Sequence, residues 1–193
     1  MEQDLGYYFK NMKKGLKYKN ELIRSMKYLS KNKKVIFMGQ SVRFSGNAIY
    51  NTLSKIDKSK KIEFPVFEEV QMGISTGLAL QGYIPVSCYP RFDFLILAMN
   101  QLVNHLDKLR FLSNKTFKPR VIIRTSIGAK KPLNGGVQHT QDYTSVFKKI
   151  LTEVNVVKLN NPNQILKEYK KALNRKDSKS TLLIENGDFY NSK

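Results

Sequence analysis

The stretch IEFPVFEEVQMGISTGLALQGYIPVSC (residues 62–88) decides the fold. Its first five residues form a short, mostly apolar segment that is typical of a strand. Val70, Ile74 and Leu78 then recur at helical spacing, until a glycine ends the pattern. Residues 83–88 form a second apolar run that predicts another strand. A strand, a helix and a strand in this order predict a crossover connection between parallel strands.

The same alternation continues on both sides of this unit. It predicts an α/β fold with a mainly parallel sheet and helices on both faces. Such sheets bind ligands at the carboxyl ends of their strands, so the candidate site lies in the loops that follow residues 38, 66, 88 and 127. The predicted strands are residues 35–38, 62–66, 83–88, 120–126, 154–159 and 181–184, and the predicted helices include residues 48–56, 95–109 and 141–150 and a helix that is capped by Asn161 and begins at Pro162.

The composition is that of a globular protein. The chain has 193 residues, of which 41% are hydrophobic, which suffices for one domain with a sizeable core. We expect residues 1–193 to form a single domain, with residues 1–20 as a flexible or helical extension. No signal peptide and no run of roughly 20 apolar residues is visible, so we expect a cytoplasmic protein. Cys88 is the only cysteine, which excludes an intramolecular disulfide and a zinc site built from cysteines.

The formal charge of +19 is unevenly spread along the chain. Residues 108–131 carry eight basic residues and no acid, whereas residues 62–107 hold five acids and one arginine. A basic surface can bind nucleic acid, an anionic membrane or an acidic protein, or it can simply be solvated. Most of these residues are lysines outside any known nucleic-acid motif. We therefore expect no membrane partner and no specific nucleic-acid binding, only weak and salt-sensitive binding to polyanions.

Five short motifs lie in order between residues 64 and 114. They are FPVFE (residues 64–68), Gly73 with Gly77, GYIPV (residues 82–86), DF (residues 93–94) and AMNQLVN (residues 98–104). In register and without a gap, they resemble the beta subunits of the decarboxylating component of 2-oxo-acid dehydrogenases, and more distantly the pyrimidine domains of transketolases. The later stretch RVIIRTSIGAKKPLNGGVQHTQ (residues 120–141) resembles the strand, glycine loop and histidine segment of that family.

The resemblance implies a three-layer fold that binds thiamine diphosphate, and it assigns Glu68 a role in that binding. In the family, a glutamate at this position hydrogen-bonds a ring nitrogen of the aminopyrimidine and so helps the cofactor to lose its thiazolium proton. Without the resemblance, Glu68 and Glu69 would be read as acids that stabilise a helix N-terminus. The family also has an acid where Gln40 stands here.

Three further residues match positions in the family's site. Phe94 matches an aromatic residue that packs on the aminopyrimidine, and Val66 lines the same pocket by its position. His139 matches a histidine that faces the thiazolium and the substrate, where it can stabilise a carboxylate or shuttle a proton. The alternatives are a core phenylalanine and a loop histidine that bonds to the backbone. His105 is read as structural or interfacial.

The resemblance also implies partners. The chain has no G-D-G motif for magnesium and diphosphate, which the family carries on an alpha subunit, so we expect an alpha-type partner that holds most of the magnesium site. The family's usual chain continues into a further domain, which we expect to be absent here or carried by another polypeptide. Gly73 and Gly77 would allow close helix approach in a homodimer within a heterotetramer. The implied function is 2-oxo-acid decarboxylation and dehydrogenation or ketol transfer, and the alternative is a catalytically silent binding or regulatory protein.

Overall fold

A six-stranded sheet forms the centre of the molecule. In a computed structural model, which describes residues 2–130 and 134–190, the strands follow the order β2-β1-β3-β4-β6-β5. Every neighbouring pair is parallel, which confirms the predicted α/β fold. The strands are β1 (Val35–Gly39), β2 (Lys61–Glu63), β3 (Ile84–Tyr89), β4 (Ile122–Ile127), β5 (Asn155–Lys158) and β6 (Thr181–Asn186).

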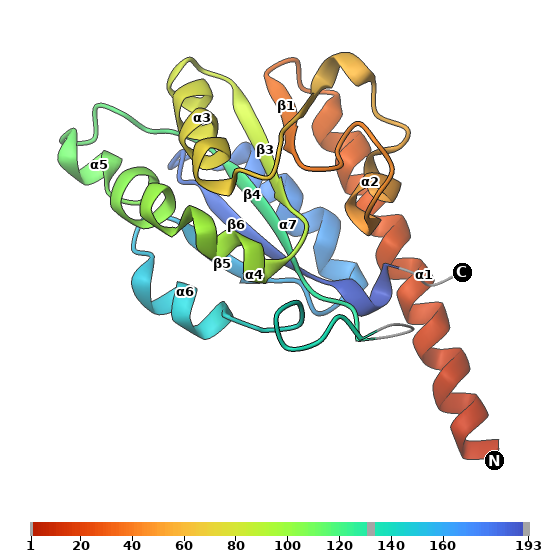
Figure 1. Cartoon of the computed structure of the whole chain (residues 1–193). Helices are drawn as coiled ribbons and strands as arrows, with labels where there is room; N and C mark the ends of the chain where they lie inside the picture. The colour runs from red at the N-terminus through yellow and green to blue at the C-terminus, as the bar shows by residue number, and fades with distance from the viewer. Residues whose placement is uncertain (1, 131–133, 191–193) are drawn as a thin grey trace.

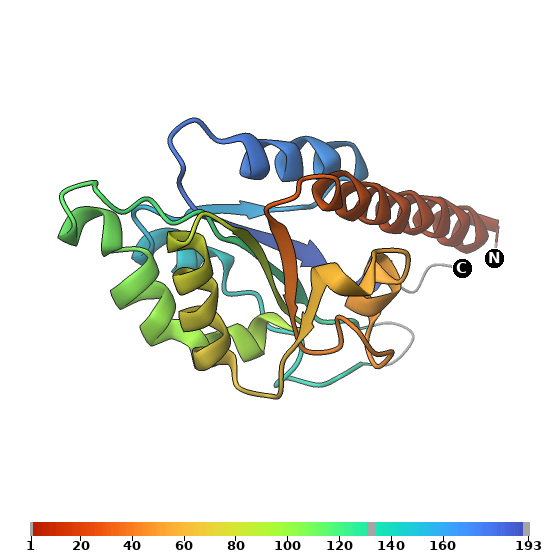
Figure 2. The same ribbon diagram turned by 90° about the horizontal axis from the view of Figure 1, so that it is seen from above.

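Helices cover both faces of the sheet, so the molecule has three layers (Figures 1 and 2). Each face has its own buried apolar cluster. In the described ranges, no helix is both long and apolar enough to cross a membrane. One face carries α1 (Glu2–Ser30), α7 (Pro162–Asn174) and the short α2 (Ala48–Leu53), and the other carries α3 (Glu68–Leu80), the segment from α4 (Phe92–Leu95) to α5 (Leu109–Leu112), and α6 (Thr144–Ile150).

A buried charge pair joins the two central strands β4 and β6. Arg124 donates to both carboxylate oxygens of Glu185, at 2.7 and 3.0 Å, and both side chains are fully buried. The hydroxyl groups of Tyr169 and Tyr190 also donate to Glu185. Burial, followed by the Glu185 charge, raises the pKa of Tyr169 well above its usual value, so this hydroxyl stays protonated as a donor. The Glu185 carboxylate thus accepts four hydrogen bonds, which offsets the cost of burying its charge, whereas Arg124 Nη1 has no hydrogen-bond partner among the described residues.

The segment predicted as one regular helix over residues 95–109 is helical but irregular, so that prediction was wrong in detail. The structure has α4, a 3-10 turn η2 (Ile96–Ala98), a π-helical segment η3 (Asn100–Leu106) and α5. The apolar side of the segment is buried as predicted, including Leu95 and Leu102. The Asp107 N–H donates to the Leu102 carbonyl at 2.9 Å, which is the wider spacing of a π turn.

Asp107, the residue directly after the π-helical segment, is bound to a distant part of the chain. It is fully buried, and its carboxylate accepts from the backbone N–H groups of Thr152, Glu153 and Val154 at 2.8–3.2 Å. These three residues lie 45 to 47 positions further along the chain and lead into β5. The apolar periodicity of the segment carries no information about this distant attachment.

The start of α7 follows the sequence signal. The Asn161 side chain accepts from the Asn163 N–H at 2.9 Å, and Pro162 is the first helical residue. This is the predicted cap, and it is confirmed because both signals are local and need no tertiary contact.

Candidate active site

The candidate site lies where the neighbouring strands β1, β3 and β4 end. Gln40 follows β1, residues 90–94 follow β3, and the long loop that contains His139 follows β4. Because the three strands are adjacent and parallel, their carboxyl ends meet at one edge of the sheet. The N-terminus of α3, with Glu68, is at the same edge (Figure 1).

Glu68 and Glu69 have opposite environments, although both belong to the first turn of α3. Glu68 is buried, with 4% of its surface exposed, and its Oε1 accepts from Gln40 Nε2 at 2.9 Å. Within the described residues, no hydrogen bond reaches its other oxygen, Oε2. Glu69 is exposed and accepts from Asn100 at 3.1 Å. The structure therefore presents Glu68 as a buried carboxylate with one oxygen held and one available.

The loop after β1 is folded around a second carboxylate. Glu63, the last residue of β2, accepts from the backbone N–H groups of Ser41, Val42 and Arg43, with 2.9 and 2.7 Å for the latter two. Three N–H groups that converge on one carboxylate form an anion-binding nest, which here is filled by the protein itself. This attachment holds the backbone on the carboxyl side of Gln40.

Gly39 permits the close approach of β1 to β3 beside this loop. Its φ is +144°, and a Cβ atom built there would lie 2.2 Å from the Cys88 carbonyl oxygen. A side chain would push the two strand ends apart and with them Gln40 and the end of β3. Sequence reasoning missed Gln40 and Glu63 as site residues. For Gln40, the only signal in the sequence was that it replaces an acid of the family motif. For Glu63 the sequence holds no signal, because its hydrogen-bond partners lie 20 to 22 residues earlier in the chain.

Phe94 and His139 are brought together by the structure. Their ring centroids are 5.5 Å apart in an edge-to-face arrangement. Arg91 Nη1 donates to the His139 carbonyl at 3.4 Å, and His139 Nδ1 lies 2.9 Å from the Gly135 carbonyl. Because a carbonyl only accepts, Nδ1 carries the proton in the neutral ring, and Nε2 is left as an acceptor.

Close packing of the loop fixes the position of His139. A Cβ atom at Gly128 would lie 1.6 Å from the His139 carbonyl oxygen, so only glycine fits after β4. This glycine belongs to the predicted glycine loop, of which residues 131–133 lie outside the described residues.

Asp93, next to Phe94, is a buried carboxylate without a hydrogen-bond partner among the described residues. Both of its oxygens are inaccessible. Burial, followed by the charge of Asp93, raises the pKa of Tyr143. A buried carboxylate whose two oxygens have no hydrogen-bond partner is unusual in a folded protein. The D-F motif had directed attention only to the phenylalanine.

Val66 is not enclosed by this chain. It lies in the loop between β2 and α3 with 77% of its surface exposed, and the neighbouring Phe67 is also exposed. A Cβ atom at Gly77 would meet nothing within 4 Å, whereas one at Gly73 would contact Gln101 at 3.5 Å. The described residues include no group of three or more His, Cys, Asp or Glu side chains that could hold a metal ion.

Comparison with known proteins identifies the family of the chain. The family model of the transketolase pyrimidine-binding domain matches residues 21–191. Over 162 residues the chain is 27% identical to the pyruvate dehydrogenase E1 component subunit beta of Gracilaria tenuistipitata var. liui, a match that covers 82% of this chain and 49% of that protein. The 2-oxoisovalerate dehydrogenase subunit beta of Bacillus subtilis (strain 168) is 22% identical over 122 residues, which cover 62% of this chain and 37% of that protein. The chain thus spans about half the length, or less, of these relatives.

Two solved structures share the fold. A split-gene transketolase, described as an inactive β4 tetramer, has a TM-score of 0.62 at 17% identity, with 89% of this chain and 50% of that chain covered. The transketolase of Campylobacter jejuni has a TM-score of 0.64 at 14% identity, with 86% and 25% covered. At these identities the likeness shows the fold alone. The family model spans most of the chain, however, and the chain therefore belongs to the transketolase pyrimidine-binding-domain family.

Proposed function

We propose that this chain supplies the aminopyrimidine-binding half of the active site of a thiamine-diphosphate enzyme that decarboxylates a 2-oxo acid. The observation that carries the proposal is Glu68. It is buried at the carboxyl edge of the sheet, in the family-matched region, with one oxygen held by Gln40 and the other available. The named relatives, beta subunits of pyruvate and 2-oxoisovalerate dehydrogenases, favour a 2-oxo acid over a ketol donor.

The residues at this edge fit the cofactor. Thiamine diphosphate, when bound, supplies the carbanion-stabilising chemistry, and the protein supplies orientation and electrostatics. The available oxygen of Glu68 would accept a hydrogen bond from the protonated ring nitrogen of the aminopyrimidine. Phe94 would pack on that ring, and Val66 would line the pocket from the loop before α3. His139, with Nε2 as an acceptor, would take or return a proton near the substrate.

A partner chain would complete the site. The pyruvate and 2-oxoisovalerate dehydrogenase relatives are named as beta subunits, which implies a further subunit in each of those enzymes. Magnesium needs oxygen ligands in addition to the cofactor's phosphates, so an alpha-type subunit would hold the diphosphate and most of the magnesium site. Such a partner, or a second copy of this chain in a heterotetramer, would cover surfaces that are open here. These surfaces are the exposed side chains of Val66 and Phe67 and the open side of Gly77.

Titration calorimetry tests this proposal. The purified chain alone should bind thiamine diphosphate weakly in magnesium buffer, because the partner chain would supply most of the contacts to the charged diphosphate. Adding a diphosphate-binding alpha-type subunit should create magnesium-dependent binding in the micromolar range or tighter, on the order of 8 kcal/mol. Binding of that strength by this chain alone would refute the half-site.

A further inference from the structure

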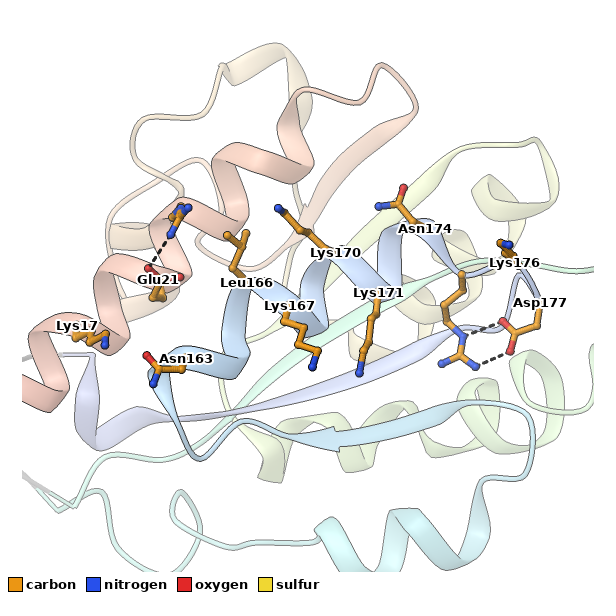
Figure 3. Close-up of a pocket in the computed structure, with 12 residues that line it drawn as sticks. Lys17, Glu21, Asn163, Leu166, Lys167, Lys170, Lys171, Asn174, Lys176 and Asp177 are labelled. Atoms are coloured by element: carbon orange, nitrogen blue, oxygen red, sulfur yellow. Dashed lines mark hydrogen bonds and ion pairs between the residues drawn. The ribbon is translucent and has the colours of Figure 1, made fainter.

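A groove of ≈ 1160 Å³ lies between α1 and α7, on the face of the sheet opposite α3 (Figures 2 and 3). Asn174 Nδ2 lies 3.5 Å from the Tyr28 hydroxyl near the C-terminal ends of the two helices. Lys17 and Asn163 line the groove further toward their N-termini. The two helices therefore run side by side in the same direction. The candidate active site lies at the carboxyl edge of the sheet and uses none of the residues that line this groove.

Basic side chains dominate the groove. Seven of its twelve lining residues are basic and two are acidic. Figure 3 shows lysines projecting from α7 along the length of the groove. Such a concentration of one charge raises the local potential for an anion. The basic lining residues are Lys17, Arg24, Lys167, Lys170, Lys171, Arg175 and Lys176.

Only some of these cations are neutralised within the protein. In the part of the chain that the structure describes, no ion pair within 4 Å involves Lys17, Lys167, Lys170 or Lys176, and all four side chains are exposed. Four unpaired lysines along one groove repel one another, so an incoming anion would be favoured. The paired cations are Arg24 with Glu21 at 3.3 Å, Lys171 with Glu168 at 2.8 Å and Arg175 with Asp177 at 2.5 Å.

We propose that this groove binds an acidic helical segment of a partner protein. A third helix can pack along the groove between two parallel helices, as in other helix-in-groove complexes. Carboxylates on one side of that helix would meet Lys17, Lys167 and Lys170. Leu166, half-buried among the lining residues, would receive an apolar side chain.

The lining favours a protein partner over a nucleic acid. Its twelve residues include no aromatic side chain on which a base could stack. The nearby Tyr28 ring is covered by the Lys170 ammonium, 4.9 Å from the ring centroid. Arginine binds phosphates and guanine bases better than lysine does, because it can form two hydrogen bonds at once. Both arginines of the lining, Arg24 and Arg175, are already paired with acids, and the unpaired cations are lysines.

Fluorescence anisotropy with the full chain tests the proposal. The probe is a labelled helical peptide with glutamates on one face and leucines on the other, at about 0.15 M salt. The groove variant is Lys17→Gln/Lys167→Gln/Lys170→Gln, and glutamine keeps the helix propensity. The matched control is Lys115→Gln/Lys118→Gln/Lys149→Gln, which removes the same charge from exposed positions outside the groove. Circular dichroism checks that both variants are folded.

The groove variant should bind the peptide about tenfold more weakly, and the control should change by less than about twofold. Leu166→Ser should weaken binding of the peptide several-fold and leave unchanged the binding of a single-stranded oligonucleotide of equal charge. Equal losses in the two triple variants would overturn the proposal, since net charge alone would then explain binding. Tighter, groove-dependent binding of the oligonucleotide or of phosphatidylserine vesicles would also overturn it. None of these outcomes depends on thiamine diphosphate, so the test is independent of the proposed enzyme function.

Discussion

Glu68 and Glu69 are chemically identical neighbours, and only their surroundings separate them. The first is buried against Gln40 and the second is exposed beside Asn100. A buried carboxylate with a fixed hydrogen bond is oriented in advance, which is what a proton relay to a cofactor requires. An exposed one is screened by water and free to rotate. The register of the FPVFE motif favours Glu68, and the structure is consistent with that choice.

Glu68→Gln should abolish most cofactor activation in the complex with an alpha-type subunit. Losing the acid–base group should slow exchange of the cofactor's thiazolium proton by about 100-fold or more. Proton exchange followed by NMR in deuterated buffer measures this step directly. Glu69→Gln is the matched control and should exchange at the wild-type rate. A loss in Glu69→Gln instead would move the assignment by one residue.

Phe94→Ala and His139→Ala should have different effects although the rings touch. Removing the aromatic face should weaken cofactor binding by roughly tenfold, because such contacts contribute about 0.5–1.5 kcal/mol beyond burial. Removing the imidazole should leave cofactor affinity nearly unchanged and lower kcat. Calorimetry and steady-state kinetics on the assembled enzyme separate the two effects. Negligible change in both variants would show that the pocket lies elsewhere.

At the scale of elements, the segment from α4 to α5 shows how one distant contact shapes a helix. The buried face agrees with the apolar periodicity, but the backbone widens into a π turn just before Asp107. That residue holds the turn before β5 through three backbone N–H groups. The attachment therefore ties the segment from α4 to α5 to the turn between α6 and β5.

Asp107→Asn should destabilise the fold in a pH-dependent way. Burial alone would raise the pKa of Asp107, but hydrogen bonds from Lys108 and from the N–H groups of residues 152–154 outweigh it and lower the pKa. The carboxylate therefore stabilises the fold fully above its ordinary pKa of about 3.9, and this stabilisation is lost as the pH falls through the lowered value. The variant should lose about 1–3 kcal/mol at pH 7.

Urea unfolding of wild type and variant at several pH values measures this difference. It should shrink once the pH falls below about 4. Glu168→Gln, which removes a carboxylate paired with Lys171 three positions further along α7, should cost little at any pH. A loss in Asp107→Asn that stays constant from neutral to acidic pH would show that the hydrogen-bond geometry matters and the charge does not.

At the scale of the whole molecule, the charge of +19 should produce attraction without selectivity. We expect weak binding to any polyanion that falls steeply with salt, because it rests on phosphate contacts and counterion release. Competition between unrelated duplexes in a gel-shift experiment should show no preference. A sequence-selective complex that survives about 0.2 M salt, where such binding has largely gone, would contradict this expectation.

The sequence by itself determined the class of fold and the family, and it predicted the edge of the sheet where the candidate site lies. Strand and helix periodicities, the Asn161–Pro162 start of α7 and the ordered motifs from residue 64 are local signals, and each is readable without a partner in space. Only the tertiary structure decided how the site is held together. The Gln40–Glu68 bond spans 28 residues, and the Glu63 nest and the Phe94–His139 contact also join distant segments. The α1–α7 groove likewise needs the two ends of the chain to lie side by side. Such contacts depend on which strands become neighbours, a choice made by packing of the whole sheet that no local pattern records.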